Sequence, residues 1–175
     1  MAFTFLKEIF RDYKVGAITK SSRFVVKKVL SEIKASDKLI VEYGPGDGVV
    51  TKPLLKILSK EAQIISIEPN ANFYKKLKKI RDKRLILING YAGKTEDEIK
   101  QADVVISSIP FTLMSKKERE EVIKFTHKTL KPRGKFVVYQ YSTLVSPLLK
   151  KYFKTVNISL EIRNFPPYFF MVCTK

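Results

Sequence analysis

The chain has 175 residues, of which 45% are apolar, enough for one domain with a sizeable core. No apolar run reaches the roughly 18 residues of a membrane-spanning helix. Cys173 is the only cysteine, which excludes an intramolecular disulfide and a cysteine-based metal site. We therefore expect a cytoplasmic protein without a metal. Its formal charge of +17 favours a polyanionic partner, either nucleic acid or an anionic membrane surface. Solvated lysines from a lysine-rich genome are the alternative explanation of this charge.

The first 14 residues predict an amphipathic helix. At about 100° per residue, one half of the helical wheel is apolar and the other half carries Lys, Arg and acidic residues. Such a helix can lie in a membrane interface, with Phe3, Leu6 and Phe10 inserted. The alternative is a helix that packs on the sheet of its own domain.

Residues 39–48, with the sequence LIVEYGPGDG, predict a buried strand that ends in a glycine-rich turn. Gly44, Gly46 and Gly48 occupy alternate positions, and the following residues can begin a helix. Open α/β sheets bind nucleotide-like ligands with this arrangement, at the carboxyl ends of their strands. Glycine lets the backbone turn sharply and approach the ligand closely. The spacing differs from the dinucleotide fingerprint G-x-G-x-x-G.

Strand and helix patterns alternate through the rest of the chain. We expect further strands over residues 63–68, 84–89, 103–107 and 135–141, and two closing strands over 155–160 and 168–173. We expect helices over 71–81, 95–100, 115–130 and 146–153, with 132–134 ending the third of these. Ser115 precedes Glu118 by three residues, which is the spacing of a capping box. The alternation predicts an α/β fold: a seven-stranded, mostly parallel sheet with helices on both faces and an antiparallel C-terminal hairpin.

The Glu42-x-Gly44-x-Gly46-x-Gly48 pattern resembles motif I of the Rossmann-like, S-adenosylmethionine-dependent methyltransferases. In that family the glycine loop lies under the methionine part of the cofactor. Glu68 ends the second strand, where an acid accepts hydrogen bonds from the ribose hydroxyls. Its alternative role is the N-cap of the next helix.

The third strand ends at Asn89-Gly90-Tyr91-Ala92. Many methyltransferases place an acid after this glycine to bind the adenine amino group, but Tyr91 stands there in this chain. Adenine recognition is then expected from backbone groups, from Asn89 or from packing on Tyr91.

The fourth strand ends at Ser107-Ser108-Ile109-Pro110-Phe111. Amino-group methyltransferases have Asn/Asp-Pro-Pro-Tyr or Asn-Leu-Pro-Tyr at this place. This chain keeps the proline and the aromatic residue but has no side-chain amide, which argues against an adenine acceptor held by its edge. The alternative is a loop that only connects two elements.

Taken together, these residues resemble a narrower group, the bacterial phospholipid N-methyltransferases, nearly from end to end. The elements that carry this resemblance are Val15–Ile18, Ser21-Ser22, residues 42–48, residues 107–111, Tyr139–Ser142 and Asn164-Phe165-Pro166-Pro167. The resemblance implies methylation of a phosphatidylethanolamine-type amine by a cytoplasmic, peripheral membrane enzyme. Residues 1–34 would form an N-terminal helical segment that covers membrane or substrate, and residues 35–175 the S-adenosylmethionine-binding domain.

The resemblance also implies roles for individual residues. Methyl transfer needs alignment and desolvation of a neutral amine, which must first lose a proton. A water or a tyrosinate-like partner is the candidate proton acceptor, with Tyr13, Tyr91 and Tyr141 as the tyrosines considered. Aromatic faces such as Phe111 and Tyr141 could hold cationic intermediates. The expected catalytic residues are Tyr13, Tyr141 and Ser107. The expected cofactor contacts are Ser22, Glu42, Tyr43, Gly44, Pro45, Gly46, Glu68, Pro69, Asn89, Gly90, Tyr91, Ala92 and Ser107. The expected substrate contacts are Ser108, Ile109, Pro110, Phe111 and Tyr141.

Two other functions remain open from the sequence. An RNA adenine N6-methyltransferase would use the positive charge to bind phosphates. Against it, residues 107–111 lack the asparagine, and no helical RNA-binding domain is expected after Cys173. A catalytically silent binding protein with a cofactor fold is the second alternative, which Tyr91 keeps open. The sequence does not indicate an oligomeric state.

Overall fold

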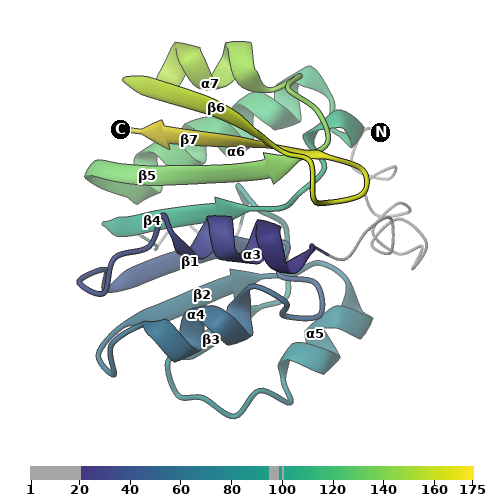
Figure 1. The fold of residues 1–175 in the computed structure, drawn as a ribbon. Coiled ribbons are helices and arrows are strands. Elements are labelled where there is room, and N and C mark those ends of the chain that lie inside the picture. The colour runs from purple at the N-terminus through teal and green to yellow at the C-terminus, as the bar shows by residue number, and fades with distance from the viewer. Residues whose placement is uncertain (1–20, 95–98, 100) are drawn as a thin grey trace.

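The computed structural model describes residues 21–94, 99 and 101–175 (Figure 1). The predicted N-terminal helix lies outside the described residues, and with it Phe3, Leu6, Phe10 and Tyr13. The same holds for most of the helix expected over 95–100.

A seven-stranded sheet forms the centre of the fold, in the order β3-β2-β1-β4-β5-β7-β6. Strand β7 pairs antiparallel with both β5 and β6, and the pairs among the first five strands in this order are parallel. This confirms the predicted α/β fold with its antiparallel C-terminal hairpin. The strands are β1 (Leu39–Tyr43), β2 (Gln63–Ile67), β3 (Leu85–Ile88), β4 (Ala102–Ser107), β5 (Leu130–Gln140), β6 (Thr155–Glu161) and β7 (Tyr168–Thr174).

The register brings the carboxyl ends of the central strands to one level. Tyr43, the last residue of β1, pairs with Ile67 on β2 and with Ser107 on β4. The loops that follow these three strands therefore meet at one edge of the sheet, where parallel α/β sheets bind ligands.

Helices cover both faces of the sheet (Figure 1). Residues of α3 and α4 pack with one face, and residues of α6 and α7 pack with the other. The helices are α3 (Arg23–Leu30), α4 (Thr51–Ile57), α5 (Ala71–Leu77), α6 (Lys116–Thr129) and α7 (Ser146–Tyr152), with a short 3-10 turn η1 (Phe111–Leu113) after β4. The predicted capping box is confirmed at α6, where Ser115 and Glu118 bond each other's backbone N–H groups.

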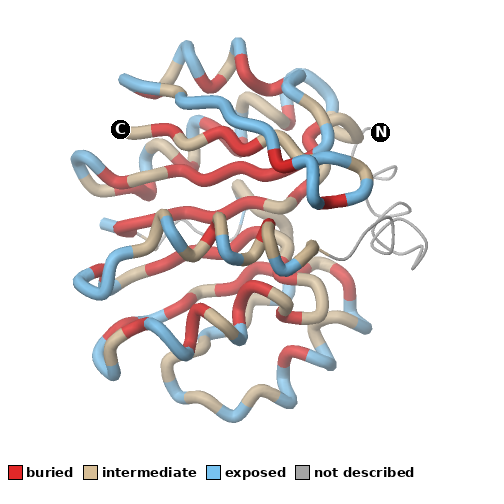
Figure 2. Tube along the Cα trace, in the orientation of Figure 1, coloured by how far each residue is buried: buried red, intermediate tan, exposed pale blue. Residues whose placement is uncertain are grey.

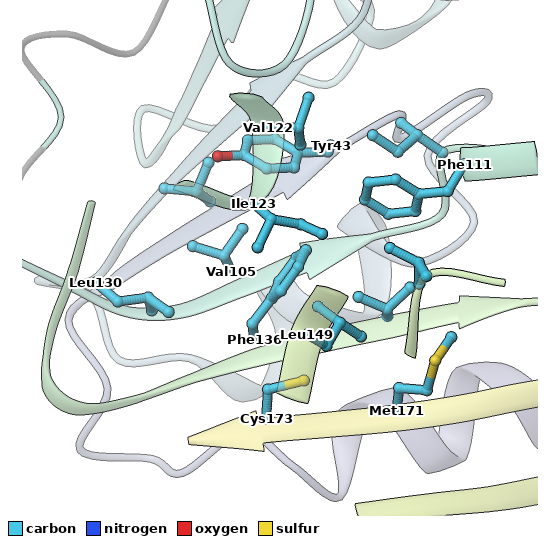
Figure 3. Packing of buried hydrophobic residues seen from close by; sticks show 14 of the residues in the cluster. Tyr43, Val105, Phe111, Val122, Ile123, Leu130, Phe136, Leu149, Met171 and Cys173 are labelled. Atoms are coloured by element: carbon cyan, nitrogen blue, oxygen red, sulfur yellow. The ribbon is translucent and has the colours of Figure 1, made fainter. Parts of the chain in front are cut away.

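Two apolar clusters fill the space between the sheet and its helices. Along β1 the side chains alternate between them: Ile40 belongs to the cluster under α3 and α4, and Val41 to the one under α6 and α7. This is the two-residue period of a strand that is buried on both faces. The second cluster is drawn in Figure 3, and Figure 2 shows that the central strands are buried while β6 is exposed along most of its length.

Two element boundaries differ from the prediction by several residues. Helix α5 ends at Leu77 instead of residue 81. Residues 132–134 belong to β5, which therefore begins at Leu130 instead of Lys135. The register between β4 and β5 shifts at this point, and Arg133 adopts a positive φ of 63°. A bulge allows the strand to absorb these extra residues.

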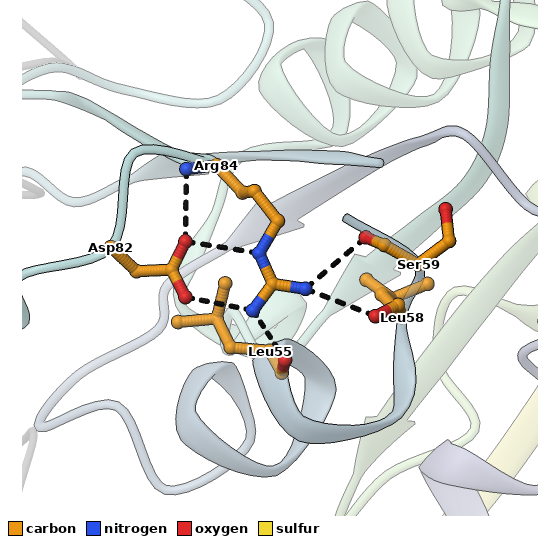
Figure 4. A network of polar contacts seen from close by, with 5 residues as sticks. All are labelled: Leu55, Leu58, Ser59, Asp82 and Arg84. Atoms are coloured by element: carbon orange, nitrogen blue, oxygen red, sulfur yellow. Dashed lines mark hydrogen bonds and ion pairs between the residues drawn. The ribbon is translucent and has the colours of Figure 1, made fainter. Parts of the chain in front are cut away.

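A charged side chain closes the end of α4 (Figure 4). The last carbonyls of a helix have no partner within it. The Arg84 guanidinium donates to the backbone oxygens of Leu55, Leu58 and Ser59, the last two at 3.0 and 3.1 Å. Asp82 holds the guanidinium with two further hydrogen bonds. This network fixes α4, and so supports the glycine loop from which the helix begins.

Candidate active site

The glycine loop, residues 44–48, connects β1 to α4 in a conformation that suits glycine. Gly44, Gly46 and Gly48 have φ values of 70°, 58° and 81°, in the left-handed region that other residues rarely adopt. A Cβ on Gly44 would lie 3.1 Å from Cγ2 of Ile109. At Gly46 the position of a Cβ has no atom of the described residues within 4 Å. The loop thus packs tightly on one side and leaves free space at Gly46.

Glu68 links the glycine loop to the end of β2. The residue is 3% exposed, and its carboxylate accepts hydrogen bonds from the backbone N–H groups of Gly46 at 3.0 Å and Asn70 at 2.8 Å. Burial raises the pKa of this carboxyl group, although the two N–H donors oppose that effect. The N-cap of α5 is Asn70, so the alternative role of Glu68 as that cap is wrong.

Glu42 lies within the sheet below the glycine loop. Its Oε2 accepts hydrogen bonds from the hydroxyls of Thr51 at 2.7 Å and Ser66 at 2.9 Å, whereas its buried Oε1 has no hydrogen-bond partner in the described part of the chain. Burial raises the pKa of Glu42 to about 7, with a smaller contribution from the charge of Glu68. The side chain supports the start of α4 from inside the protein and does not line the pocket beside the loop.

An open pocket of about 490 Å³ lies at the carboxyl ends of β1, β2, β3 and β4. It brings together residues predicted to contact the cofactor from three loops, and it is bounded on one side by α6. The lining residues are Gly44, Ile67, Pro69, Tyr91, Ala92, Gly93, Lys94, Ile109, Met114, Glu118, Glu121 and Val122. The sequence does not predict that α6 lines this pocket, because the capping box indicates where the helix begins but not which elements it faces.

The loop after β4 is attached directly to the glycine loop. Ser108 Oγ donates to the backbone oxygen of Gly44 at 2.6 Å. The buried Tyr139 hydroxyl is hydrogen-bonded to Ser108 and Ser21, and burial raises its pKa. Ser107 is fully buried. Tyr139 was not predicted as a site residue, although the Tyr139–Ser142 element carried part of the resemblance.

Three aromatic residues have different surroundings. The rings of Tyr43 and Phe111 are fully buried in the cluster of Figure 3, so neither offers a face to a ligand in this conformation. Tyr141 is 40% exposed, and its hydroxyl lies 2.6 Å from Oγ1 of Thr112. Of the two predicted aromatic substrate contacts, Phe111 and Tyr141, the second is thus the accessible one.

Two elements of the narrower resemblance that lie far apart in the sequence, Ser21-Ser22 and Asn164–Pro167, meet in space. The backbone N–H of Ser22 donates to Oδ1 of Asn164 at 2.9 Å, and Nδ2 of Asn164 donates to the backbone oxygen of Pro166. Ser22 Oγ accepts the N–H of Val25 as the N-cap of α3. The role that these contacts give to Ser22 and Asn164 is to anchor the start of α3. The predicted contact of Ser22 with the cofactor stays a prediction.

The sequence from β1 to β5 decides the family. Residues 40–134, more than half of the chain, match the family model described as a methyltransferase domain. The chain belongs to this methyltransferase family. It is an S-adenosylmethionine-dependent methyltransferase with the corresponding fold.

Comparisons with individual proteins place this methyltransferase among distant relatives. It is 22% identical to the ornithine lipid N-methyltransferase of Singulisphaera acidiphila, over 94% of this chain and 91% of that protein. It is 26% identical to a probable ribosomal RNA small subunit methyltransferase A of Methanospirillum hungatei, over 52% of this chain and 36% of that protein. The 1,6-didemethyltoxoflavin-N1-methyltransferase structure from Burkholderia thailandensis superposes with a TM-score of 0.78, at 11% identity over 99% of this chain and 88% of that one.

The residues of the methyltransferase fit its cofactor. The space at Gly46 and the adjoining carboxylate of Glu68 suit the amino acid and ribose parts, and the apolar pocket at Ile67, Pro69 and Ile109 suits a flat base. Within the described residues no group of three or more His, Cys, Asp and Glu side chains could hold a metal ion. In the same part of the chain, no helix combines the length and the apolar character needed to cross a membrane.

Proposed function

We propose that this methyltransferase transfers a methyl group from S-adenosylmethionine to the amine of a lipid headgroup at a membrane surface. The observation that carries this proposal is the similarity to a lipid N-methyltransferase over 94% of the chain. That similarity extends beyond the cofactor-binding half, which methyltransferases of many substrates share.

The chain's own part in the reaction is to align the two reactants and exclude water. The cofactor supplies an electrophilic methyl group that an unprotonated amine can attack. The glycine loop and Glu68 position the cofactor, and the hydrogen bond from Ser108 to Gly44 keeps the loop after β4 in register with it. Tyr141, the exposed residue directly after β5, is the candidate to face a cationic headgroup with its ring or, as a tyrosinate, to accept the proton.

Exposed apolar and basic side chains support a membrane location. Ile162 and Phe165, in the loop between β6 and β7, are 71% and 89% exposed. The same loop contacts the start of α3 through Asn164, and Arg23 and Lys27 on α3 are exposed. Apolar side chains beside cations fit an anionic lipid surface, where each basic residue contributes about 1 kcal/mol. The predicted N-terminal helix with Phe3, Leu6 and Phe10 would add to this attachment.

Methylation of RNA adenine is the competing function. The ribosomal RNA methyltransferase relative matches 52% of this chain and only 36% of its own length. Ser107 and Ser108 provide no side-chain amide for an adenine edge, and both hydroxyls lie in a conformation set by backbone contacts.

An acceptor assay tests the proposal. The protein, methyl-labelled S-adenosylmethionine and vesicles with phosphatidylethanolamine or ornithine lipid are incubated beside a reaction with unmodified ribosomal RNA. We expect label in lipid, loss of transfer in Glu68→Ala, and normal transfer in Glu61→Ala, a control at an exposed acid. Label in RNA but not in lipid would refute the lipid acceptor.

Vesicle flotation tests the membrane location separately. We expect attachment to anionic vesicles that decreases when residues 1–14 are deleted, or in the variant Phe165→Ser. Equal attachment of all three proteins would refute these surfaces as the membrane contact.

A further inference from the structure

Only one of the two carboxylate oxygens of Glu118, on α6, has a hydrogen-bond partner among the described residues. Its Oε2 accepts the backbone N–H of Ser115 at 2.8 Å, and its own N–H donates to Ser115 Oγ at 3.3 Å. These two bonds complete the capping box. The residue is 6% exposed, and its Oε1 is buried without a hydrogen-bond partner among the described residues. Because an unpaired buried acceptor is costly, this oxygen is suited to a ligand that brings its own donor.

Glu118 borders the same pocket as the loop after β3. Tyr91, Ala92 and Glu118 all line it. A Cβ on Gly93 would lie 3.2 Å from Cα of Val122, so this loop lies directly on α6. Val122 is one helical turn after Glu118, and residues four apart share a helix face. The carboxylate is therefore on the side of α6 that faces Tyr91 and Ala92.

The ligand that fits this oxygen is an amino-purine. The pocket walls are apolar at Ile67, Pro69 and Ile109 and suit a flat ring. The exocyclic amino group is the donor on the edge of adenine, and the position after Gly90 provides Tyr91 in place of an acid. An acid from another element can supply the missing acceptor.

We propose that Glu118 Oε1 accepts a hydrogen bond from the adenine amino group and makes this site select a 6-amino over a 6-oxo purine. Glu118 is thus a binding residue that combines helix capping with cofactor selection. This inference rests on the cofactor of the methyltransferase family and is independent of the methyl acceptor.

Calorimetric binding of two ligands tests it without catalysis. S-adenosylhomocysteine carries a 6-amino group, and S-inosylhomocysteine has a carbonyl oxygen in its place. We expect the wild type to prefer the first by roughly 10- to 100-fold, the range for a hydrogen bond to a charged group. Glu118→Gln retains an oxygen for Ser115 and puts an NH₂ group in place of Oε1, so we expect its preference to disappear or reverse.

The matched control is Glu121→Gln, an exposed acid on the same helix that also lines the pocket. We expect it to keep the wild-type preference. The ratio of the two affinities is measured on one preparation, so an unfolded fraction cancels. An unchanged preference in Glu118→Gln, its loss in Glu121→Gln, or no preference in the wild type would overturn the proposal. The result is separate from the lipid assay, since lipid transfer can fail while the purine preference persists.

Discussion

Replacing Glu42 by Gln should make stability less dependent on pH. The folded protein raises the pKa of this carboxyl from 4.5 to about 7, mainly because the group is buried. An acid with a raised pKa binds its proton more tightly in the folded state. Its ionisation therefore costs stability, beginning near pH 4.5 and complete above pH 7. In Glu42→Gln the amide keeps an oxygen for the Thr51 and Ser66 hydroxyls and carries no charge at any of these pH values.

The size of the effect follows from the two pKa values. At 1.36 kcal/mol for each pH unit, the rise from 4.5 to about 7 corresponds to roughly 3 kcal/mol. We expect the free energy of unfolding of Glu42→Gln, relative to wild type, to increase by about this amount between pH 4 and pH 8. Urea unfolding without cofactor, at intervals of half a pH unit, measures the difference.

A difference that stays constant from pH 4 to pH 8 would show that folding does not shift the pKa of Glu42, and would refute the reasoning. Glu121→Gln serves as the control, because that side chain is exposed. The difference in the free energy of unfolding between Glu42→Gln and wild type at pH 4 does not test the reasoning, since an amide and a protonated carboxyl form different hydrogen bonds with Thr51 and Ser66.

Three further predictions test the supports of the site. In urea unfolding, Gly44→Ala should destabilise the protein more than Gly46→Ala. Both substitutions incur about 1–2 kcal/mol of strain from the left-handed backbone, but only the Cβ at residue 44 would lie as close as 3.1 Å to a neighbouring atom. Equal losses of stability would contradict this packing. Arg84→Met should cost about 2 kcal/mol, because the Leu55 and Leu58 carbonyls at the end of α4 lose the Arg84 donor; Arg81→Met is the exposed control. Asn164→Ala should cost about 1 kcal/mol and expose the start of α3 to limited proteolysis; an unchanged cleavage rate would contradict the contact with Ser22.

The sequence predicted the sheet well because its signals are local. Each of the central strands is a short apolar run, and Ser115 with Glu118 marks the start of α6 within four residues. The bulge at residues 132–134 was missed, since Pro132 and Gly134 indicate a turn locally. The register shift opposite Ala102 that keeps them in β5 depends on a distant strand.

The candidate site was predicted in part for the same reason. The glycine loop can be read from spacing alone, whereas Glu118 enters the pocket through the packing of α6 on Gly93. Phe111 illustrates the opposite case: its place after β4 suggested a substrate contact, but the η1 turn directs its ring into the core. Which way a loop side chain points depends on tertiary packing that a single sequence does not display.

The hydrogen bond between Ser22 and Asn164 has a consequence for the order of folding. It joins residues 142 positions apart, so the ribosome has made nearly the whole described chain before the N-terminus of α3 can be fastened. Contacts of such long sequence separation close slowly, because a large loop entropy must be overcome first. We therefore expect α3 to dock late, after β6 and β7 have paired, although it precedes all the strands of the described sheet in the sequence.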